Sequence, residues 1–275
     1  MHYTDVDKRI LELRRTADVF KEKGFAETSS RLSALSLLLK DGISHKAMIQ
    51  EYMDLLNLFG NEFKESLNFG NDYRWYCLKE IGDLIHDFVE AVEIAKVRES
   101  WSATFPIMQN LASGKRTIDE ISQTFYDKSI DRRTRFHLTC YSYLIIVEGT
   151  FDEVARIIFF LTALKNGDDV NIQEVQRLEV RDIYAKLNPK PTLLRNWEEK
   201  KHIRNAIGHA TAYFDETNNT VRFVDNFVKS KPFDKTYRWE EFIEILSELQ
   251  SSVSAFILFM VLYRVRDVLF AVDLP

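Results

Sequence analysis

The chain has 275 residues, of which 45% are hydrophobic, and its formal net charge is −5 at pH 7. This hydrophobic content is enough for a sizeable core, whereas the acidic balance argues against a broad, sequence-independent nucleic-acid surface, which needs clustered positive charge. A small, local basic site is not excluded. Cys77 and Cys140 argue against a disulfide framework or a zinc knuckle and are typical of a reducing compartment.

Four amphipathic helices are expected in the first hundred residues. Apolar side chains recur there at three- and four-residue spacings, which is the helical period. Gly24 and Gly42 end the first two helices and Ser44 caps the third, while the fourth runs from about 71 to 98. We assign residues 1–100 to an N-terminal helical region, for which the sequence indicates no function.

Residues 101–130 are less regular and form the expected boundary between two parts of the chain. Pro106 and Ser113-Gly114 are typical of a connector, with one short helix expected over 118–125. The chain then divides into the N-terminal region, this connector, and a helical domain over 131–275.

Two long apolar helices are expected to form the core of the helical domain. The first, about 135–164, carries large apolar side chains on more than one face and should be central. The last, about 239–270, is apolar all round between Val253 and Tyr263, so neighbouring helices or a second subunit must bury it. Between them we expect helices over 172–187 and from Thr192 to about Ala210, and a strand, Thr220–Val224, after the turn at Asn218-Asn219.

The predicted fold class is therefore all-α: a helical bundle with an additional N-terminal helical region and at most one small β-hairpin, near 213–224. The start of the chain lacks the pattern of a signal peptide. The longest apolar stretch, Ala255–Tyr263, is far shorter than the roughly 20 residues of a membrane span. We expect a soluble, cytoplasmic protein with no membrane partner.

Arg204, Asn205 and His209 form the motif best suited to chemistry. The planar guanidinium of arginine donates two parallel hydrogen bonds to a phosphodiester and keeps its charge. Histidine titrates near neutral pH and can exchange a proton with a ribose hydroxyl or a leaving oxygen, and asparagine can orient either partner. Together these residues suffice for RNA cleavage by the 2′-hydroxyl, with no metal or cofactor.

Helix geometry leaves three arrangements of this motif open. On a straight helix, residues five apart differ by about 140° in direction, so Asn205 and His209 share a face that Arg204 does not. The helix can end around Gly208, or the long Arg204 side chain can reach round. Alternatively, two copies of the motif can meet across a two-fold axis.

The same spacing occurs at Arg132 and His137, so the spacing alone is weak support. Arg132 is followed by a second arginine rather than a small polar residue, and the segment is typical of a helix start. We expect this second pair to be structural, with a salt-bridged arginine and a partly exposed histidine.

The segment Ile203–Ala210, in its context, resembles the signature of the HEPN superfamily, Arg-x4–6-His with a polar residue directly after the arginine. A long apolar helix with an acidic residue precedes it, a short strand and an apolar helix follow, and the resemblance covers about 131–270. It implies a helical bundle that often dimerises through its motif face. It also implies a metal-independent endoribonuclease of toxin–antitoxin, antiviral or RNA-processing systems. By this resemblance, Arg204 and His209 are the catalytic pair and Asn205 orients them.

One departure from the family concerns tyrosine. Some toxin members carry a tyrosine two positions after the histidine, where a partner nucleotidyltransferase modifies it. Thr211 occupies that position here and a tyrosine follows at Tyr213, which we keep as a possible supporting residue. The difference weakens the prediction of such a partner.

Three weaker candidates have competing interpretations. Glu148 can hold the guanidinium of Arg204 or can be a carboxylate at the edge of the core that pairs elsewhere. A second set of residues shares one helix face and can bind a metal: Asp83, His86, Asp87 and Glu90. A stripe of solvated charges is the favoured interpretation of this set. A third set can contact RNA: Lys229, Lys231 and Lys235, near Phe227 and Phe233. A charged loop is the favoured interpretation of this set.

The sequence thus predicts a metal-independent endoribonuclease that acts on RNA, as a homodimer, with an antitoxin or regulatory protein as a further candidate partner. No cofactor and no metal are expected. The alternative is a non-catalytic helical module that binds RNA, a nucleotide or a protein.

Overall fold

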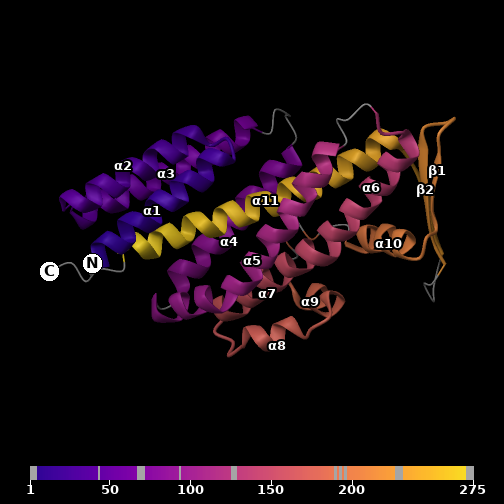
Figure 1. Cartoon of the computed structure of the whole chain (residues 1–275). Helices are drawn as coiled ribbons and strands as arrows, with labels where there is room; N and C mark the ends of the chain where they lie inside the picture. Colours follow the sequence, from indigo (N-terminus) through magenta and orange to yellow (C-terminus); the bar gives the residue numbers. More distant parts are fainter. Residues whose placement is uncertain are drawn as a thin grey trace. The chain divides into compact units, whose positions relative to one another are not determined.

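A computed structural model describes residues 5–42, 44–66, 72–92, 94–124, 129–188, 191, 194, 197–226 and 232–270. The chain is mostly α-helical with one small three-stranded sheet (Figure 1), which confirms the predicted fold class. It divides into two compact units, one of residues 1–75 with 258–275 and the other of residues 76–257. This division differs from the expected one.

The first unit contains three of the expected N-terminal helices: α1 (Asp5–Glu22), α2 (Ala26–Asp41) and α3 (His45–Ser66). Gly24 and Gly42 end the first two helices in the left-handed region, with φ of 88° and 81°, which glycine adopts without steric cost. The Gly42 N–H donates to the carbonyl of Leu38, closing the last turn. Aromatic rings fill the space between the helices: Phe20, Phe25, Phe59 and Phe63.

The predicted last helix is α11 (Trp239–Phe270), and its apolar run is covered within the chain. In the first unit, Tyr52 donates from Oη to the carbonyl of Leu262 at 3.4 Å, and the rings of Phe59 and Phe259 lie 5.2 Å apart. In the second unit, Phe256 is fully buried. These contacts show cover of Phe259 and Leu262 by an N-terminal helix, which was the alternative to a dimer interface. The dimer itself stays a prediction.

Among the described residues, one helical segment is long and apolar enough to cross a membrane, and it is residues 239–265 of α11. More than half of its most apolar window is buried inside the protein. Core helices of soluble proteins have the same length and composition, so this observation is weak support for a span.

The second unit begins with α4 (Asp72–Ala91, whose first residues belong to the first unit) and α5 (Ile94–Thr124). The expected connector over 101–130 was wrong for residues 101–117, which continue α5 through Pro106, whereas the short helix expected from residue 118 is the end of α5. Helix-spaced apolar residues within it, Ile107, Leu111 and Ile118, are almost fully buried. Packing of this face stabilises the helix against its weak local propensity.

The predicted central helix over 135–164 is present as three consecutive segments. They are α6 (Arg132–Leu144), the π-helix η1 (Ile145–Phe151) and α7 (Asp152–Lys165). The position of the π-turn was not predicted, because its apolar residues continue the pattern of the helix on either side. Such turns occur frequently at functional sites, and this one contains Glu148.

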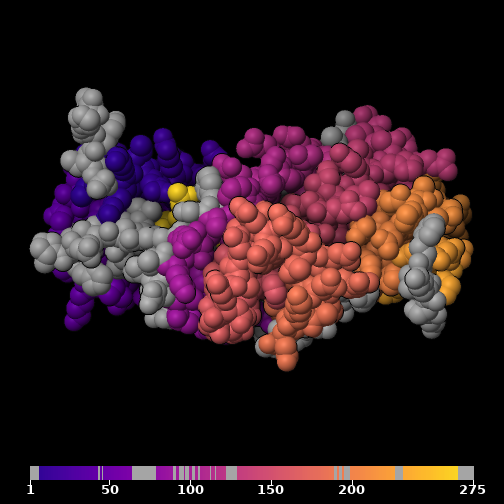
Figure 2. Space-filling model, turned by 90° about the horizontal axis from the view of Figure 1, so that it is seen from below, coloured from indigo at the N-terminus to yellow at the C-terminus, as the bar shows by residue number. Residues whose placement is uncertain are grey.

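The expected helix over 172–187 is divided into α8 (Ile172–Gln176) and α9 (Val180–Lys186), which lie at the surface of this unit (Figure 2, salmon). Asn171 caps α8 by accepting from the Gln173 N–H at 2.8 Å. The N–H groups of Arg177 and Leu178 then close tight three-residue turns, which end α8 before α9 begins. The expected helix start at Thr192 lies outside the described residues.

The sheet has the order β1-β2-β3, with both pairs antiparallel: β1 (Ala212–Asp215), β2 (Thr220–Asp225) and β3 (Phe233–Arg238). The hairpin of β1 and β2 is the predicted one. The third strand was missed, because only Tyr237 is buried in it and the segment therefore reads as a charged loop.

Gly114 on α5 provides a test of the packing against η1. A Cβ at this position would lie 2.8 Å from Cγ2 of Thr150, whose hydroxyl is bonded to the carbonyl of Ile146. Gly114→Ala gains about 1 kcal/mol of helix propensity, but overpacking costs about 1–3 kcal/mol. We expect a net loss in unfolding free energy, measured by urea denaturation.

The matched control removes the clashing methyl group. In a Thr150→Ser background, Gly114→Ala should be neutral or stabilising. Gly149→Ala should also be tolerated, because nothing lies within 4 Å of a Cβ there. An equal loss in both backgrounds would show that this contact does not limit packing.

Candidate functional site

The motif helix, α10 (Trp197–Gly208), ends in a tight reversal. The N–H of Thr211 donates to the carbonyl of Ala206 at 2.8 Å, and that of Ala210 donates to Ile207 at 3.0 Å. This pair of bonds is a Schellman motif, with Ala210 in the left-handed region at φ 55°. The helix therefore ends at Gly208, the first of the three arrangements considered, and His209 lies in the turn before β1.

Arg204 faces the π-helix. Its Nη1 lies 3.4 Å from Oε1 of Glu148, and the two side chains are 30% and 54% exposed. Two interpretations of Glu148 were open, and in the structure its carboxylate pairs with the Arg204 guanidinium. Because both groups reach solvent, this ion pair contributes little to stability and can exchange partners.

Buried polar atoms without a hydrogen-bond partner lie around this pair, in the part of the chain that the structure describes. They are Nε of Arg204, Nε of Arg156 and Oδ1 of Asp152. Burial raises the pKa of Asp152 to about 7, although the charges of Arg156 and Arg204 oppose the shift. Asp152 follows Glu148 by four residues, so a carboxyl group that titrates near neutrality accompanies the Arg204–Glu148 pair.

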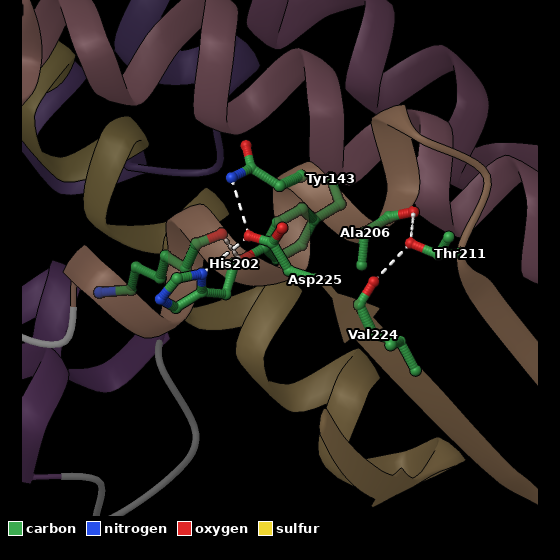
Figure 3. Close-up of polar contacts among 8 residues, drawn as sticks. Tyr143, His202, Ala206, Thr211, Val224 and Asp225 are labelled. Atoms are coloured by element: carbon green, nitrogen blue, oxygen red, sulfur yellow. Dashed lines mark hydrogen bonds and ion pairs between the residues drawn. The ribbon is translucent and has the colours of Figure 1, made fainter. Parts of the chain in front are cut away.

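Asn205 faces the sheet instead. Its Nδ2 donates to Oδ2 of Asp225 at 2.9 Å, and Nδ1 of His202 lies 2.8 Å from the same oxygen. Asp225 has no exposed surface. Figure 3 shows the His202 ring and the Asp225 carboxylate facing one another. A fully buried carboxylate thus joins two side chains of α10 to the end of β2.

His202 and Asp225 were not singled out from the sequence, although signals for both were present. His202 precedes Asn205 by three residues and so shares its helix face. Asp225 follows the predicted strand in the inward register, since Val221 and Phe223 are also buried. A carboxylate at an inward strand position needs a polar partner.

Several further contacts fix α10 in place. The Tyr143 hydroxyl donates to the carbonyl of Lys200 at 3.1 Å, and Glu199 accepts from Lys235 and Tyr237 on β3. Although burial raises it, these two bonds hold the pKa of Glu199 below its ordinary value. The Thr211 hydroxyl donates to the carbonyl of Val224 (Figure 3). The motif helix is therefore tied to both α6 and the sheet.

The remaining predicted site residues lie near the end of α10. The His209 side chain is exposed, and its backbone N–H donates to the carbonyl of Asn205 at 2.9 Å. Tyr213 is 55% exposed on β1, opposite Arg222 in the strand register. The structure thus directs Arg204 towards η1 and Asn205 towards β2, with His209 in the turn that follows.

The arginine of the second Arg-x4-His pair has structural contacts, but with neutral groups and an aromatic ring where a salt bridge was expected. Arg132 bonds to Asn219 in the hairpin turn and to the carbonyl of Glu216, and its guanidinium lies 5.9 Å from the ring centre of Phe214. It therefore holds the start of α6 on the hairpin. His137 is exposed.

Two of the four candidate metal ligands on α4, Asp83 and Asp87, are engaged in ion pairs. Asp83 lies 2.6 Å from Lys79, and Asp87 lies 2.6 Å from Lys165; the Lys165 ammonium lowers the pKa of Asp87. The side chain of Glu90 is outside the described residues, and the residues that are described contain no group of three metal-ligating side chains in position to hold an ion. The lysine candidates at 229 and 231, with Phe227, also lie outside the described residues.

A cavity of about 400 Å³ lies between α5, α7 and the segment before α8. Most of its charged lining is acidic, with Glu99, Asp168, Asp169 and Glu174 against Lys96. None of the predicted site residues lines it. An acidic cavity repels the phosphates of RNA, so it does not compete with α10 as the candidate site.

Comparison with family models, with curated proteins and with solved structures finds no match to this chain. The functional argument therefore starts from the residues of α10 and their partners.

The raised pKa of Asp152 predicts how stability depends on pH. In the unfolded chain an aspartate titrates near 3.9, so between about 4 and about 7 the folded state binds the extra proton. The unfolding free energy therefore falls as pH rises through this window and stays low above it. Asp152→Asn should be more stable than the wild type at pH 8, by at most about 4 kcal/mol, and this gain should shrink at pH 5.

Urea denaturation at the two pH values measures this difference. Asp131→Asn is the control, because hydrogen bonds from Thr134 lower the pKa of this exposed helix cap and its replacement should give no gain at pH 8. A gain for Asp152→Asn that is the same at both pH values would contradict the assignment.

Proposed function

We propose that this protein is a metal-independent endoribonuclease of the HEPN type, with a role in toxin–antitoxin or antiviral defence. The observation that carries the proposal is the motif Arg204-Asn205-x3-His209 at the end of α10. Its asparagine is held by the buried carboxylate of Asp225. A polar motif residue fixed by a buried carboxylate is typical of a pre-organised site.

The reaction is a transphosphorylation within the RNA. The ribose 2′-hydroxyl attacks the adjacent phosphorus, the bond from phosphorus to O2′ forms, and the bond to O5′ breaks. His209 acts as general base or general acid, moving a proton from O2′ or to O5′. Arg204 stabilises the negative charge that develops on the phosphate oxygens, and Asn205 orients the reacting groups. No cofactor is needed.

The Arg204–Glu148 pair fits this role. Glu148 keeps the guanidinium oriented, yet the pair is exposed enough for a phosphodiester to replace the carboxylate as its partner. A planar guanidinium binds a phosphate with two parallel hydrogen bonds. This exchange would place the positive charge of Arg204 against the phosphate oxygens, where negative charge develops in the transition state.

One observation favours the alternative, a non-catalytic module that binds RNA, a nucleotide or a protein. Arg204 pairs with Glu148 on η1, whereas Asn205 bonds to Asp225 on β2, so these motif side chains face different elements. A binding surface does not need the motif side chains to converge. The cleavage assay separates the two functions.

The proposed partners follow from the same resemblance. RNA is the substrate, a second copy of the chain completes a homodimer, and an antitoxin or regulatory protein controls the activity. We place the protein in the cytoplasm, with no membrane partner.

Cleavage of RNA should persist in excess EDTA and leave 2′,3′-cyclic phosphate ends, because His209 and Arg204 replace the two tasks of a metal ion. His209→Ala should lower the rate roughly 10² to 10⁴-fold, and Arg204→Ala should lower it comparably. Arg204→Lys should not restore it fully, because the planar fork is lost. Gel assays on labelled RNA and end-group analysis measure these outcomes.

The matched control is His137→Ala, which removes the histidine of the second Arg-x4-His pair and should leave the rate nearly unchanged. Retained cleavage in His209→Ala, or an absolute need for Mg²⁺, would defeat the mechanism. If the wild type binds RNA without cleaving it, the binding module is the better description.

The oligomeric state is tested separately. Light scattering at micromolar concentration should give twice the chain mass of 32.3 kDa, since a two-fold axis would let Arg204 of one copy approach His209 of another. A strictly monomeric mass would exclude the composite site, and the motif would then have to act within one chain.

A further inference from the structure

The most unusual polar arrangement in the second unit is the one around Asp225. The carboxylate is fully buried, and its Oδ2 receives hydrogen bonds from two side chains of the same helix, His202 and Asn205. Burying an ionised carboxylate is costly unless it is paired and hydrogen-bonded. Both partners flank Arg204 in the sequence, so this carboxylate is built into the motif helix.

The hydrogen bond to Asp225 determines what each partner can do. A carboxylate only accepts, so His202 donates its Nδ1–H, and in the neutral ring the lone pair is then on Nε2. Figure 3 shows this second ring nitrogen pointing away from Asp225. Likewise, Asn205 uses Nδ2 as the donor, which leaves its carbonyl oxygen free to accept. A histidine anchored in this way is oriented as a proton acceptor.

The His202 ring is held in position without being enclosed. It stacks on Phe233 of β3, with centroids 5.0 Å apart and planes 18° from parallel, and 17% of the side chain is exposed. The stacked ring and the bonded Nδ1 fix the imidazole, while the remaining exposure leaves it accessible. A purely structural contact would not require an accessible second nitrogen.

His202 and His209 both lie close to Asn205 in the chain. His202 precedes it by about one turn of α10, and His209 is in the turn that ends the helix, where its backbone N–H donates to the Asn205 carbonyl at 2.9 Å. Arg204 points elsewhere, towards Glu148. His202 and His209 are therefore two groups, one on each side of Asn205 in the sequence, that can exchange protons.

We propose that His202 is a second acid–base residue of the site and that Asp225 is the residue that positions it. This inference rests on the proposed ribonuclease function and deepens it. Nε2 of His202 takes the proton from the 2′-hydroxyl as O2′ bonds to phosphorus. As the bond to O5′ breaks, the His209 imidazolium gives a proton to O5′. The products are a 2′,3′-cyclic phosphate and a 5′-hydroxyl, and solvent restores both rings.

The experiment measures the pH–rate profile of RNA cleavage in EDTA for the full chain. His202→Gln keeps a donor to Asp225 but cannot exchange a proton, so it should lose roughly 10² to 10⁴ in rate and the rising limb of the profile. His209→Gln should lose the falling limb. Asp225→Asn should lower the rate and reduce the share of neutral His202 rings protonated on Nδ1, because a side-chain amide can donate as well as accept. A structural role would lower the rate without moving either limb.

His137→Gln is the matched control, and thermal melts establish that each variant is folded. A second measurement uses long-range ¹H–¹⁵N spectra of the histidine rings, in which the neutral wild-type His202 should carry its proton on Nδ1. If the wild type cleaves RNA and His202→Gln cleaves it with the same rate and pH profile, the role of His202 is overturned. The proposed ribonuclease function then still stands. A neutral His202 protonated on Nε2 also overturns it. Absence of cleavage by the wild type overturns the proposed function itself, and with it this role.

Discussion

The burial of one carboxylate, that of Asp225, constrains the region around α10. Because it has no access to solvent, its charge must be compensated by groups that the fold supplies, and these are His202 and Asn205. These bonds therefore connect the end of β2 to the motif helix. Thr211, which bonds to both Ala206 and Val224, repeats the same connection one turn further on.

Much of the fold could be predicted because helical periodicity and glycine stops act locally. The helices ending near Gly24 and Gly42, and the last helix, α11, required no knowledge of distant contacts. The helix through Pro106 could not be predicted, since only the burial of its apolar face stabilises it. The same holds for β3, whose residues become a strand by pairing with β2.

The candidate site was predictable in part for the same reason. Arg204, Asn205 and His209 were recognisable as a motif along one helix, and the acidic residue Glu148 was a candidate partner for Arg204. Whether Glu148 reaches Arg204 depends on how η1 packs on α10, which no local pattern specifies. The pairing of His202 with Asp225, 23 residues apart, likewise depends on the sheet. Spacing alone could not separate the motif from the pair Arg132 and His137, of which Arg132 has structural contacts.

The π-turn of η1 has a consequence for how this chain can vary. A π-turn holds one residue more than an α-turn, so it acts as a single-residue insertion absorbed inside a continuous helix. Deleting one residue between Ile145 and Phe151 would therefore let the segment become α-helix while α6 and α7 kept their register. Asp152 and Arg156 would stay near Arg204, but the residues within the turn would change direction, and Glu148 is one of them. Sequence length in this one turn therefore affects how Glu148 meets the motif arginine.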